Sequence, residues 1–365
     1  MFCHSVSTPI VKPVNGLCNI SCSYCYAIGL KEHAVIRNRM CPEILKAVID
    51  FFCRDQDDIE FIWHGGEPLL AGLDFYRMVT EFQGVWERRG KRITNFLQTN
   101  ATLITPQWVR FFAENNFLIG VSLDGPKEFH DQVRCYSSGK GSYDNVMRGI
   151  DLLSGAGIFN GIICGISTAN YRFPKEIFNF FIEKKIKKLK FARVKSIGHC
   201  DDISSLVISP AQYADFMIAI FDIWLELDDP EVEIRDIQSV VNLILGGNKR
   251  ECIYMGQCDQ FVTVYSDGSI YGCDSFPKID ALRFGSVLDE SSIVQSNSHL
   301  QNFRELLRRR KEHCQTCDWY FICKGGCAKD CYEQLDSVEP LSEVCENLKR
   351  YFEYISTGIK SYNLL

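Results

Sequence analysis

The chain has 365 residues, a length that predicts about two domains of ~150 residues each. Its composition, 46% hydrophobic and 24% charged, is that of a globular protein with a large core. The net charge of −6 gives no electrostatic basis for binding nucleic acid. No apolar run approaches the ~18 residues that span a bilayer, and the N-terminus lacks a signal-peptide pattern. We therefore expect a cytoplasmic protein with no membrane or nucleic-acid partner.

Short strand patterns alternate with amphipathic helical patterns over the first 235 residues. Strands are expected at 8–14, 59–63, 93–98, 118–123, 161–166 and 189–194. Helices are expected at 42–53, 106–115, 142–154, 174–185 and 209–228, several of them with proline in the first turn. Repeated β-α units predict a parallel sheet, either a full or partial (β/α) barrel or an open doubly wound sheet. We expect residues 1–235 to form this domain and residues 236–365 a loop-rich, cysteine-rich second domain with a final helix near 341–359.

The 18 cysteines are unevenly distributed. Cys18, Cys22 and Cys25 follow the first expected strand, and nine more lie between residues 252 and 345. Cytosolic thiols stay reduced, so ligation explains this clustering better than disulfides do. A structural zinc site would need a fourth ligand. Three cysteines on one loop can instead hold three corners of an iron–sulfur cluster and leave the fourth iron open.

Polar residues follow three of the expected strands. The run His64-Gly65-Gly66-Glu67-Pro68 comes after 59–63, where two glycines allow a ligand close to the backbone and Glu67 can accept hydrogen bonds from an ammonium group. Side chains at the next two strand ends are expected to face the same ligand, although each is also a common turn residue: Thr99, Asn100, Ser122 and Asp124.

The spacing C-x3-C-x2-C, with Tyr24 inside it and GGEP after the next strand, resembles the radical S-adenosylmethionine (SAM) family. The resemblance implies that Cys18, Cys22 and Cys25 bind a [4Fe–4S] cluster whose open iron is chelated by SAM. One electron would cleave SAM to methionine and a 5′-deoxyadenosyl radical, which abstracts a substrate hydrogen. The implied SAM contacts are Tyr24, Gly65, Gly66, Glu67, Asn100, Ser122 and Arg134.

The C-terminal cysteines resemble a SPASM domain, which carries two auxiliary [4Fe–4S] clusters after a partial (β/α)6 radical SAM barrel. By position, one cluster would be held by an inner set, Cys252, Cys258, Cys273 and Cys327. The other would be held by an outer set, Cys314, Cys317, Cys323 and Cys345. The chain would then carry three clusters, with two zinc knuckles as the alternative for this half. The remaining cysteines are expected to be ordinary core or surface thiols: Cys3, Cys41, Cys53, Cys135, Cys164, Cys200 and Cys331.

The strongest resemblance is to the anaerobic sulfatase-maturating enzymes, which convert a sulfatase cysteine or serine to formylglycine. It is carried by LAGL, QTNATLI, SLDGPKEFH, SDGSIYGCD and CDWYFICKGGC. It implies Cβ–H abstraction, with Asp274 as the base that then accepts a proton and the auxiliary clusters as the route for the excess electron. A low-potential donor such as flavodoxin or ferredoxin would supply reducing electrons.

One residue departs from the maturase pattern. His64 precedes GGEP, where the maturases carry glutamine, and WHGGEP is a form associated with SPASM enzymes that cross-link ribosomally made peptides. The alternative substrate is therefore a small precursor peptide in which the Cβ radical attacks a neighbouring side chain, as in a cyclophane. His64 is predicted to line the substrate pocket, with ordinary packing as the alternative. A non-catalytic iron–sulfur or zinc scaffold is a third class, which SAM cleavage would exclude.

Overall fold

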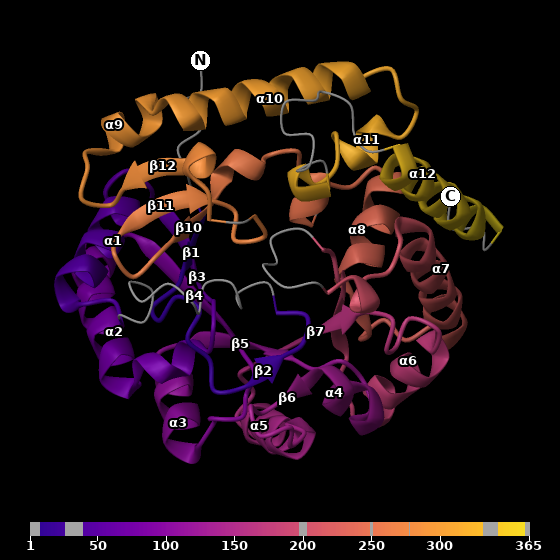
Figure 1. The fold of residues 1–365 in the computed structure, drawn as a ribbon, viewed down its shortest axis with the longest axis horizontal. Helices are drawn as coiled ribbons and strands as arrows, with labels where there is room; N and C mark the ends of the chain where they lie inside the picture. Colours follow the sequence, from indigo (N-terminus) through magenta and orange to yellow (C-terminus); the bar gives the residue numbers. More distant parts are fainter. Residues whose placement is uncertain are drawn as a thin grey trace.

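The computed structural model describes residues 8–25, 39–196, 203–248, 251–276, 278–330 and 342–361. The predictions for Cys3, Cys200 and Cys331 lie outside these residues. Within them, strands of one long sheet run through the middle of the molecule, and most of the helices form an outer ring around them (Figure 1).

Six parallel strands form the barrel portion of the sheet and lie side by side in chain order. They are β1 (Thr8–Val11), β3 (Asp58–Trp63), β4 (Arg92–Thr99), β5 (Phe117–Ser122), β7 (Phe159–Ile166) and β8 (Lys188–Arg193). A doubly wound sheet would reverse its strand order at a switch point, so this unreversed order identifies a partial barrel. The short strand β9 (Glu233–Ile234) extends one edge, and β2 (Ser21–Cys22) pairs with β6 (Arg134–Cys135) in a separate ribbon.

The helices that connect these strands are α1 (Pro42–Arg54), α2 (Leu73–Glu87), α3 (Pro106–Glu114), α4 (Lys127–Val133), α5 (Tyr143–Gly155), α6 (Pro174–Glu183) and α7 (Pro210–Leu227). Proline occupies the first turn of α1, α3, α6 and α7, as expected, and Ser209 with Gln212 forms a full capping box on α7. Helices α2 and α4 were not predicted. Neither has a side-chain N-cap or a proline in its first turn, the two start signals on which the prediction relied.

Packing in the core fixes where β3 ends. Along β3, Ile59, Phe61 and Trp63 alternate with more exposed residues and are buried on one face. Trp63 packs edge-on against Tyr76 of α2, and its indole nitrogen donates to Asn95 Oδ1 of β4 at 2.8 Å. The next residue in the chain is His64, so this packing sets the position from which the GGEP loop starts.

The C-terminal part continues the same sheet. Strand β10 (Phe261–Val264) lies parallel to β1, with Thr8 opposite Phe261, and is followed by antiparallel β11 (Ser269–Gly272) and β12 (Arg283–Ser286). The remaining helices are α8 (Arg235–Ile244), α9 (Ser291–Ser296), α10 (Ser298–Cys314), α11 (Tyr320–Cys323) and α12 (Ser342–Ser361). The expected domain boundary near residue 235 stays a prediction, and the sheet crosses it.

One described segment, Ser204–Leu227, is long and apolar enough by length and composition to cross a membrane, although no such run was expected. Most of this segment is α7, which packs between α6 and α12. Polar contacts join α7 to α12: Arg350 pairs with Asp215, and the Tyr354 hydroxyl donates to Asp222. These are the contacts of a helix packed within a protein.

Candidate active site

The three N-terminal cysteines lie close together on the loop between β1 and α1. Burial raises the pKa of the Cys22 thiol to about 12, and Cys25 and Cys18 push that pKa in the same direction, as nearby negative groups do. Cys22 lies on β2, where its pairing with Arg134 of β6 anchors the loop. The tertiary structure therefore keeps together the three thiols that the spacing singled out.

Hydrogen-bond donors reach two of these sulfurs. Asn100 Nδ2 lies 3.7 Å from Cys18 Sγ, and Arg134 Nη1 lies 3.7 Å from Cys22 Sγ. A cationic donor and an amide donor beside the thiols suit an anionic four-iron cluster, whose sulfurs accept such hydrogen bonds. Across the described ranges, no group of three or more His, Cys, Asp or Glu side chains is arranged to hold a single metal ion.

The two glycines after His64 form a backbone cradle that no other residue fits. Gly65 and Gly66 have φ of +95° and +55°, in the left-handed region. A Cβ on Gly66 would lie 2.1 Å from the carbonyl oxygen of Leu17, and one on Gly65 would meet the Lys12 side chain at 2.6 Å. The backbone of the GGEP loop is thus pressed against the strand and loop that lead to Cys18.

Glu67 ties the ends of two barrel strands together. Its carboxylate is fully buried, with Oε1 accepting from Thr99 Oγ1 (2.7 Å) and Leu69 N (3.1 Å), and Oε2 accepting from Asn100 N (2.8 Å). Burial nevertheless raises the pKa of Glu67 to about 7. These donors tie the ends of β3 and β4 together. Oε2 accepts only one of these hydrogen bonds, so the expected contact with an ammonium group stays a prediction.

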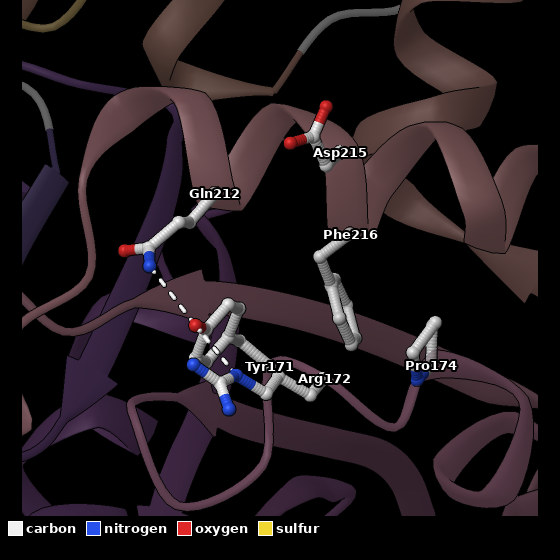
Figure 2. Close-up of a pocket in the computed structure, with 6 residues that line it drawn as sticks. All are labelled: Tyr171, Arg172, Pro174, Gln212, Asp215 and Phe216. Carbon is white, nitrogen blue, oxygen red and sulfur yellow. Dashed lines mark hydrogen bonds between the residues drawn. The ribbon is translucent and has the colours of Figure 1, made fainter.

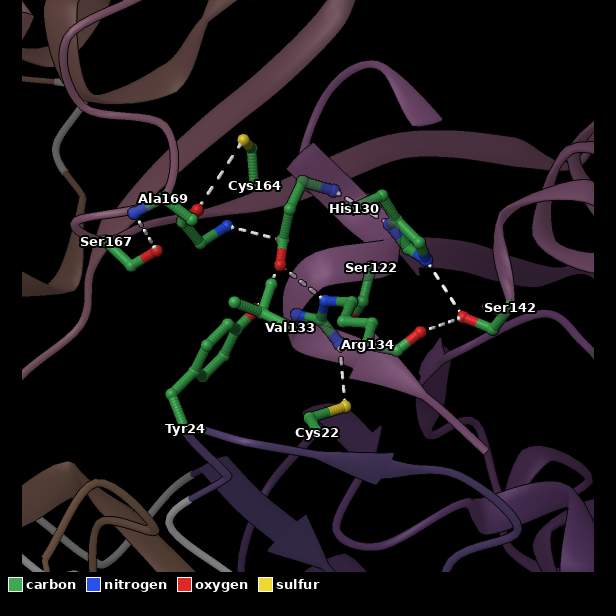
Figure 3. A network of polar contacts seen from close by, with 12 residues as sticks. Cys22, Tyr24, Ser122, His130, Val133, Arg134, Ser142, Cys164, Ser167 and Ala169 are labelled. Carbon is green, nitrogen blue, oxygen red and sulfur yellow. Dashed lines mark hydrogen bonds and ion pairs between the residues drawn. The ribbon is translucent and has the colours of Figure 1, made fainter. Parts of the chain in front are cut away.

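A buried carboxylate, Asp124, organises two of the expected SAM contacts, Tyr24 and Arg134, which Figure 3 shows close to each other. Its Oδ2 accepts from the Tyr24 hydroxyl and from Arg134 Nε at 2.8 Å, and its Oδ1 accepts from Gly165 N at 2.8 Å. The Arg134 guanidinium also lies 5.3 Å from the centre of the Tyr24 ring. Tyr24 and Arg134 are therefore held by one acid supplied from the end of β5.

His130, which the sequence analysis missed, lies behind this carboxylate. Its Nδ1 is 3.2 Å from Asp124 N, and its Nε2 is 2.9 Å from Ser142 Oγ, which donates to the Arg134 carbonyl oxygen. A backbone N–H can only donate, so Nδ1 accepts and Nε2 carries the proton. Burial lowers the pKa of His130 to about 4, which keeps the ring neutral near pH 7. No local motif marks this histidine, because its partners come from the turn before α4 and the start of α5.

Asn100 and Ser122 lie at the ends of β4 and β5, as expected. Asn100 Oδ1 accepts from Thr102 N at 3.0 Å, an Asx-turn, while its Nδ2 donates to Asn19 at 2.9 Å as well as facing Cys18. Ser122 Oγ accepts from Gln98 Nε2 at 3.1 Å. For Asn100 the turn role and the role beside the cysteine loop are therefore combined.

His64 and Asp274 meet although 210 positions separate them. His64 Nδ1 lies 2.8 Å from Asp274 Oδ2, and the two side chains are 30% and 13% exposed. Asp274 follows β11 and Cys273, whereas His64 follows β3. The pair thus brings the residue that departs from the maturase pattern into contact with the expected base.

Lys12 connects this pair to the N-terminal cysteines. It is 1% exposed, and burial lowers the pKa of its ammonium group. Asp274, Cys273 and Cys25 each act to raise that pKa, so all three lie near the ammonium. Sequence reasoning missed Lys12, although a lysine inside the apolar run TPIVKPV was a usable signal.

The inner-set cysteines influence one another. Burial raises the pKa of Cys258 to about 12, and Cys327 and Cys252 raise it further. Burial also raises the pKa of Cys273, where Cys327 and Cys252 act in the same sense. The hairpin that carries Cys273 and the turn that carries Cys327 therefore converge.

The outer-set cysteines form a second group. Burial raises the pKa of Cys323 to about 12, and the cysteines that raise it further are Cys314, Cys345 and Cys317. Cys345 lies on α12, so the last helix closes this group. These four cysteines are the ones that the SPASM resemblance assigns to the outer set, and their role as cluster ligands stays a prediction.

A separate surface pocket of about 290 Å³ lies between the loop after β7 and the start of α7 (Figure 2). Its lining includes none of the expected site residues: Tyr171, Arg172, Pro174, Gln212, Asp215 and Phe216. The Tyr171 hydroxyl accepts from Arg172 Nε at 2.8 Å and from Gln212 Nε2 at 3.0 Å. These three polar groups of the pocket are therefore already paired with one another.

Comparison with known proteins identifies the family. Residues 13–181 match the radical SAM superfamily. The chain is 31% identical to the serine-type anaerobic sulfatase-maturating enzyme of Bacteroides thetaiotaomicron, over 95% of this chain and 89% of that protein. The chain belongs to the anaerobic sulfatase-maturating enzymes of the radical SAM superfamily. It is also 31% identical to the cysteine-type maturase of Clostridium perfringens strain 13, over 94% of this chain and 95% of that one.

Solved structures agree with this assignment. Native anSMEcpe with bound AdoMet and the Cp18Cys peptide has a TM-score of 0.87 and 30% identity, covering 97% of this chain and 98% of that chain. SuiB of Streptococcus suis bound to its precursor peptide SuiA has a TM-score of 0.67 but 16% identity, which shows a shared fold alone. The partial barrel and the radical SAM enzyme class are confirmed, and the maturase reading is supported over the cross-linking alternative.

Proposed function

We propose that this chain converts a cysteine or serine of a sulfatase segment into formylglycine, using SAM and three [4Fe–4S] clusters. The main support is the Asp274–His64 pair, which lies near the same buried lysine as Cys25. A base is therefore close to the loop expected to hold the radical-generating cluster. The cysteine-type and serine-type relatives are equally similar, so either side chain remains a candidate substrate.

When bound, SAM and its cluster would supply the radical that removes the substrate Cβ hydrogen, and the auxiliary clusters would accept an electron. Asp274 takes the proton that leaves the substrate thiol or hydroxyl, so the side chain loses one hydrogen atom, one proton and one electron. A serine becomes an aldehyde directly, and a cysteine becomes a thioaldehyde, which water hydrolyses to the aldehyde with release of hydrogen sulfide. His64 Nδ1–H holds the Asp274 carboxylate in place.

The proposal also assigns residues to the bound groups. Cys18, Cys22 and Cys25 hold the SAM cluster, and the inner and outer cysteine sets hold one auxiliary cluster each. SAM would be held by the residues expected to contact it: Tyr24, Gly65, Gly66, Glu67, Asn100, Ser122 and Arg134. A low-potential flavodoxin or ferredoxin supplies electrons in the cytoplasm, where the cysteines stay reduced.

The decisive experiment is an anaerobic assay of the reconstituted enzyme with SAM, a reductant and three peptides. One contains a sulfatase C-x-P-x-R segment, the second its serine counterpart, and the third is a precursor peptide encoded beside the gene. Formylglycine, detected by mass spectrometry and by hydrazide trapping of the aldehyde, supports the proposal. A new bond between side chains of the precursor peptide, with no aldehyde on the other two, would replace it with the cross-linking activity.

A further inference from the structure

Arg310 of α10 is a buried cation without a partner in the described part of the chain. The residue is 2% exposed, and none of its three guanidinium nitrogens has a hydrogen-bond acceptor there. A guanidinium stays protonated in proteins, and an unpaired buried charge is strongly destabilising. A group of opposite charge is therefore expected at this position.

The surroundings of Arg310 include groups of the inner cysteine set. Its Cγ and Cδ lie 3.6 and 3.7 Å from the place a Cβ would occupy on Gly325, which has φ +92°. Gly325 and Gly326 form the turn that leads into Cys327. Arg310 is also one of the groups that lower the pKa of Cys258, so its charge lies within reach of that thiol. The Arg310 side chain therefore packs against the turn before Cys327, and its charge lowers the pKa of Cys258.

The outer set is the competing neighbour, because Cys314 follows Arg310 by one turn of α10. The groups that shift the pKa of Cys323 are its own cysteines and the Gly325 backbone. The Gly325 contact is shared by both sets, because the Gly325 backbone also acts on Cys323. Arg304 of the same helix pairs with Asp259, the residue after Cys258, at 3.1 Å. This contact, together with the effect of Arg310 on Cys258, favours the inner set.

We propose that the Arg310 guanidinium donates hydrogen bonds to the sulfurs of the auxiliary cluster held by the inner set and raises its reduction potential. This inference rests on the proposed presence of that cluster. Reduction adds a negative charge to an already anionic cluster, so a buried cation and N–H···S bonds stabilise the reduced form more than the oxidised form. The inner cluster thereby becomes a better acceptor for the electron that leaves the substrate.

The test is an anaerobic redox titration of the reconstituted holoenzyme, monitored by electron paramagnetic resonance. Arg310→Met removes the charge and the donors at similar length, and Arg310→Lys keeps the charge. Arg309→Met is the matched control, because Arg309 is the adjacent arginine on the same helix but is exposed. The SAM cluster is recognised by the change that SAM makes to its signal. Cys258→Ser and Cys317→Ser mark the inner and outer transitions.

In Arg310→Met, we expect the midpoint potential of the inner cluster to fall by at least about 59 mV. For one electron this equals a tenfold change in the reduced-to-oxidised ratio. The midpoint potential should fall less in Arg310→Lys and should be unchanged in Arg309→Met. If the methionine variant loses iron, Arg310→Gln, which is neutral but keeps an amide donor, must show the fall. Unchanged midpoints at full iron content, or movement of the outer transition alone, would overturn the proposal. The titration needs no substrate, so its result is independent of whether formylglycine is formed.

Discussion

At the scale of single residues, Asp124 shows how one buried acid can organise a binding site. It accepts hydrogen bonds from Tyr24, Arg134 and Gly165, three segments far apart in the chain. His130 in turn accepts from the Asp124 backbone. A change at either position should therefore affect how Tyr24 and Arg134 are presented to a ligand.

His130 should make the protein acid-sensitive. Its pKa is about 4 when folded and 6.5 ordinarily, so the unfolded chain binds the extra proton between these values. The neutral ring stabilises the fold above pH 6.5, and about 3 kcal/mol is lost as the pH falls to about 4. In His130→Asn, which keeps an acceptor for Asp124 N, this loss should disappear.

The measurement is the apparent Tm of both proteins from pH 8 to pH 4 under anaerobic conditions. Glu67 titrates in the opposite sense, since its raised pKa makes its contribution fall as the pH rises to about 7, but this effect is common to both proteins and cancels in their difference. A constant Tm difference across the range would refute the assignment of His130.

Asp274 should be required for product formation but not for SAM cleavage. Asp274→Asn removes the base, and we expect at least a ~100-fold loss of product with 5′-deoxyadenosine still formed. His64→Gln should retain product, because the amide can still donate to Asp274, whereas His64→Ala should lower it. Mass spectrometry quantifies the modified peptide and 5′-deoxyadenosine. Normal product yield from Asp274→Asn would remove this residue from the mechanism.

At the scale of elements, the site depends on how the GGEP loop lies against the cysteine loop. Glu67 N donates to the Leu17 carbonyl at 2.8 Å, and Gly66 leaves no room for a side chain beside the same oxygen. The Glu67 carboxylate then ties this contact to Asn100 at the end of β4. Two loops and a strand end are thereby locked together.

Gly66→Ala should break this arrangement. The Cβ would collide with the Leu17 oxygen, and we expect SAM affinity to fall at least ~10-fold, a loss of about 1.4 kcal/mol. Gly90→Ala is the matched control, because Gly90 also has positive φ (+89°) but nothing lies within 4 Å of its Cβ position. Anaerobic calorimetry measures both affinities. An equal loss in the two variants would attribute the effect to backbone strain instead of this contact.

At the scale of the whole molecule, the two halves are parts of one sheet. Strand β10 pairs with β1, the strand that leads into the N-terminal cysteine loop. The same contact brings Asp274 near Lys12. The C-terminal half thus brings the expected base, Asp274, to the barrel half.

The iron content should reflect three clusters. We expect about twelve irons per reconstituted chain, four per cluster. Cys345→Ala should lower this to about eight, while the exposed Cys41, which belongs to no set, should be replaceable by alanine without loss. Iron and sulfide analysis measures both. About four irons in the unmodified enzyme would contradict the two-cluster C-terminal half.

Much of the fold could be predicted because its signals are local. The β3, β4, β5, β7 and β8 strands and the proline-started helices were found close to their actual bounds. Helix α2 was missed because it begins after Gly72 with no capping side chain. The strand expected at 8–14 ends at Val11. Lys12 N still donates to the Val264 carbonyl at 2.8 Å, but Pro13 has no N–H with which to continue the ladder.

By itself, the sequence determined the chemistry available to this protein: cysteine spacing, the GGEP run and Asp274 after Cys273 are properties of short segments. Only the tertiary structure decided that Glu67 is a buried clamp, that His64 meets Asp274, and that Arg310 is buried without a partner in the described residues. The physical reason is that hydrogen bonding, burial and unpaired charge depend on which distant residues the fold brings together, and no local pattern records that.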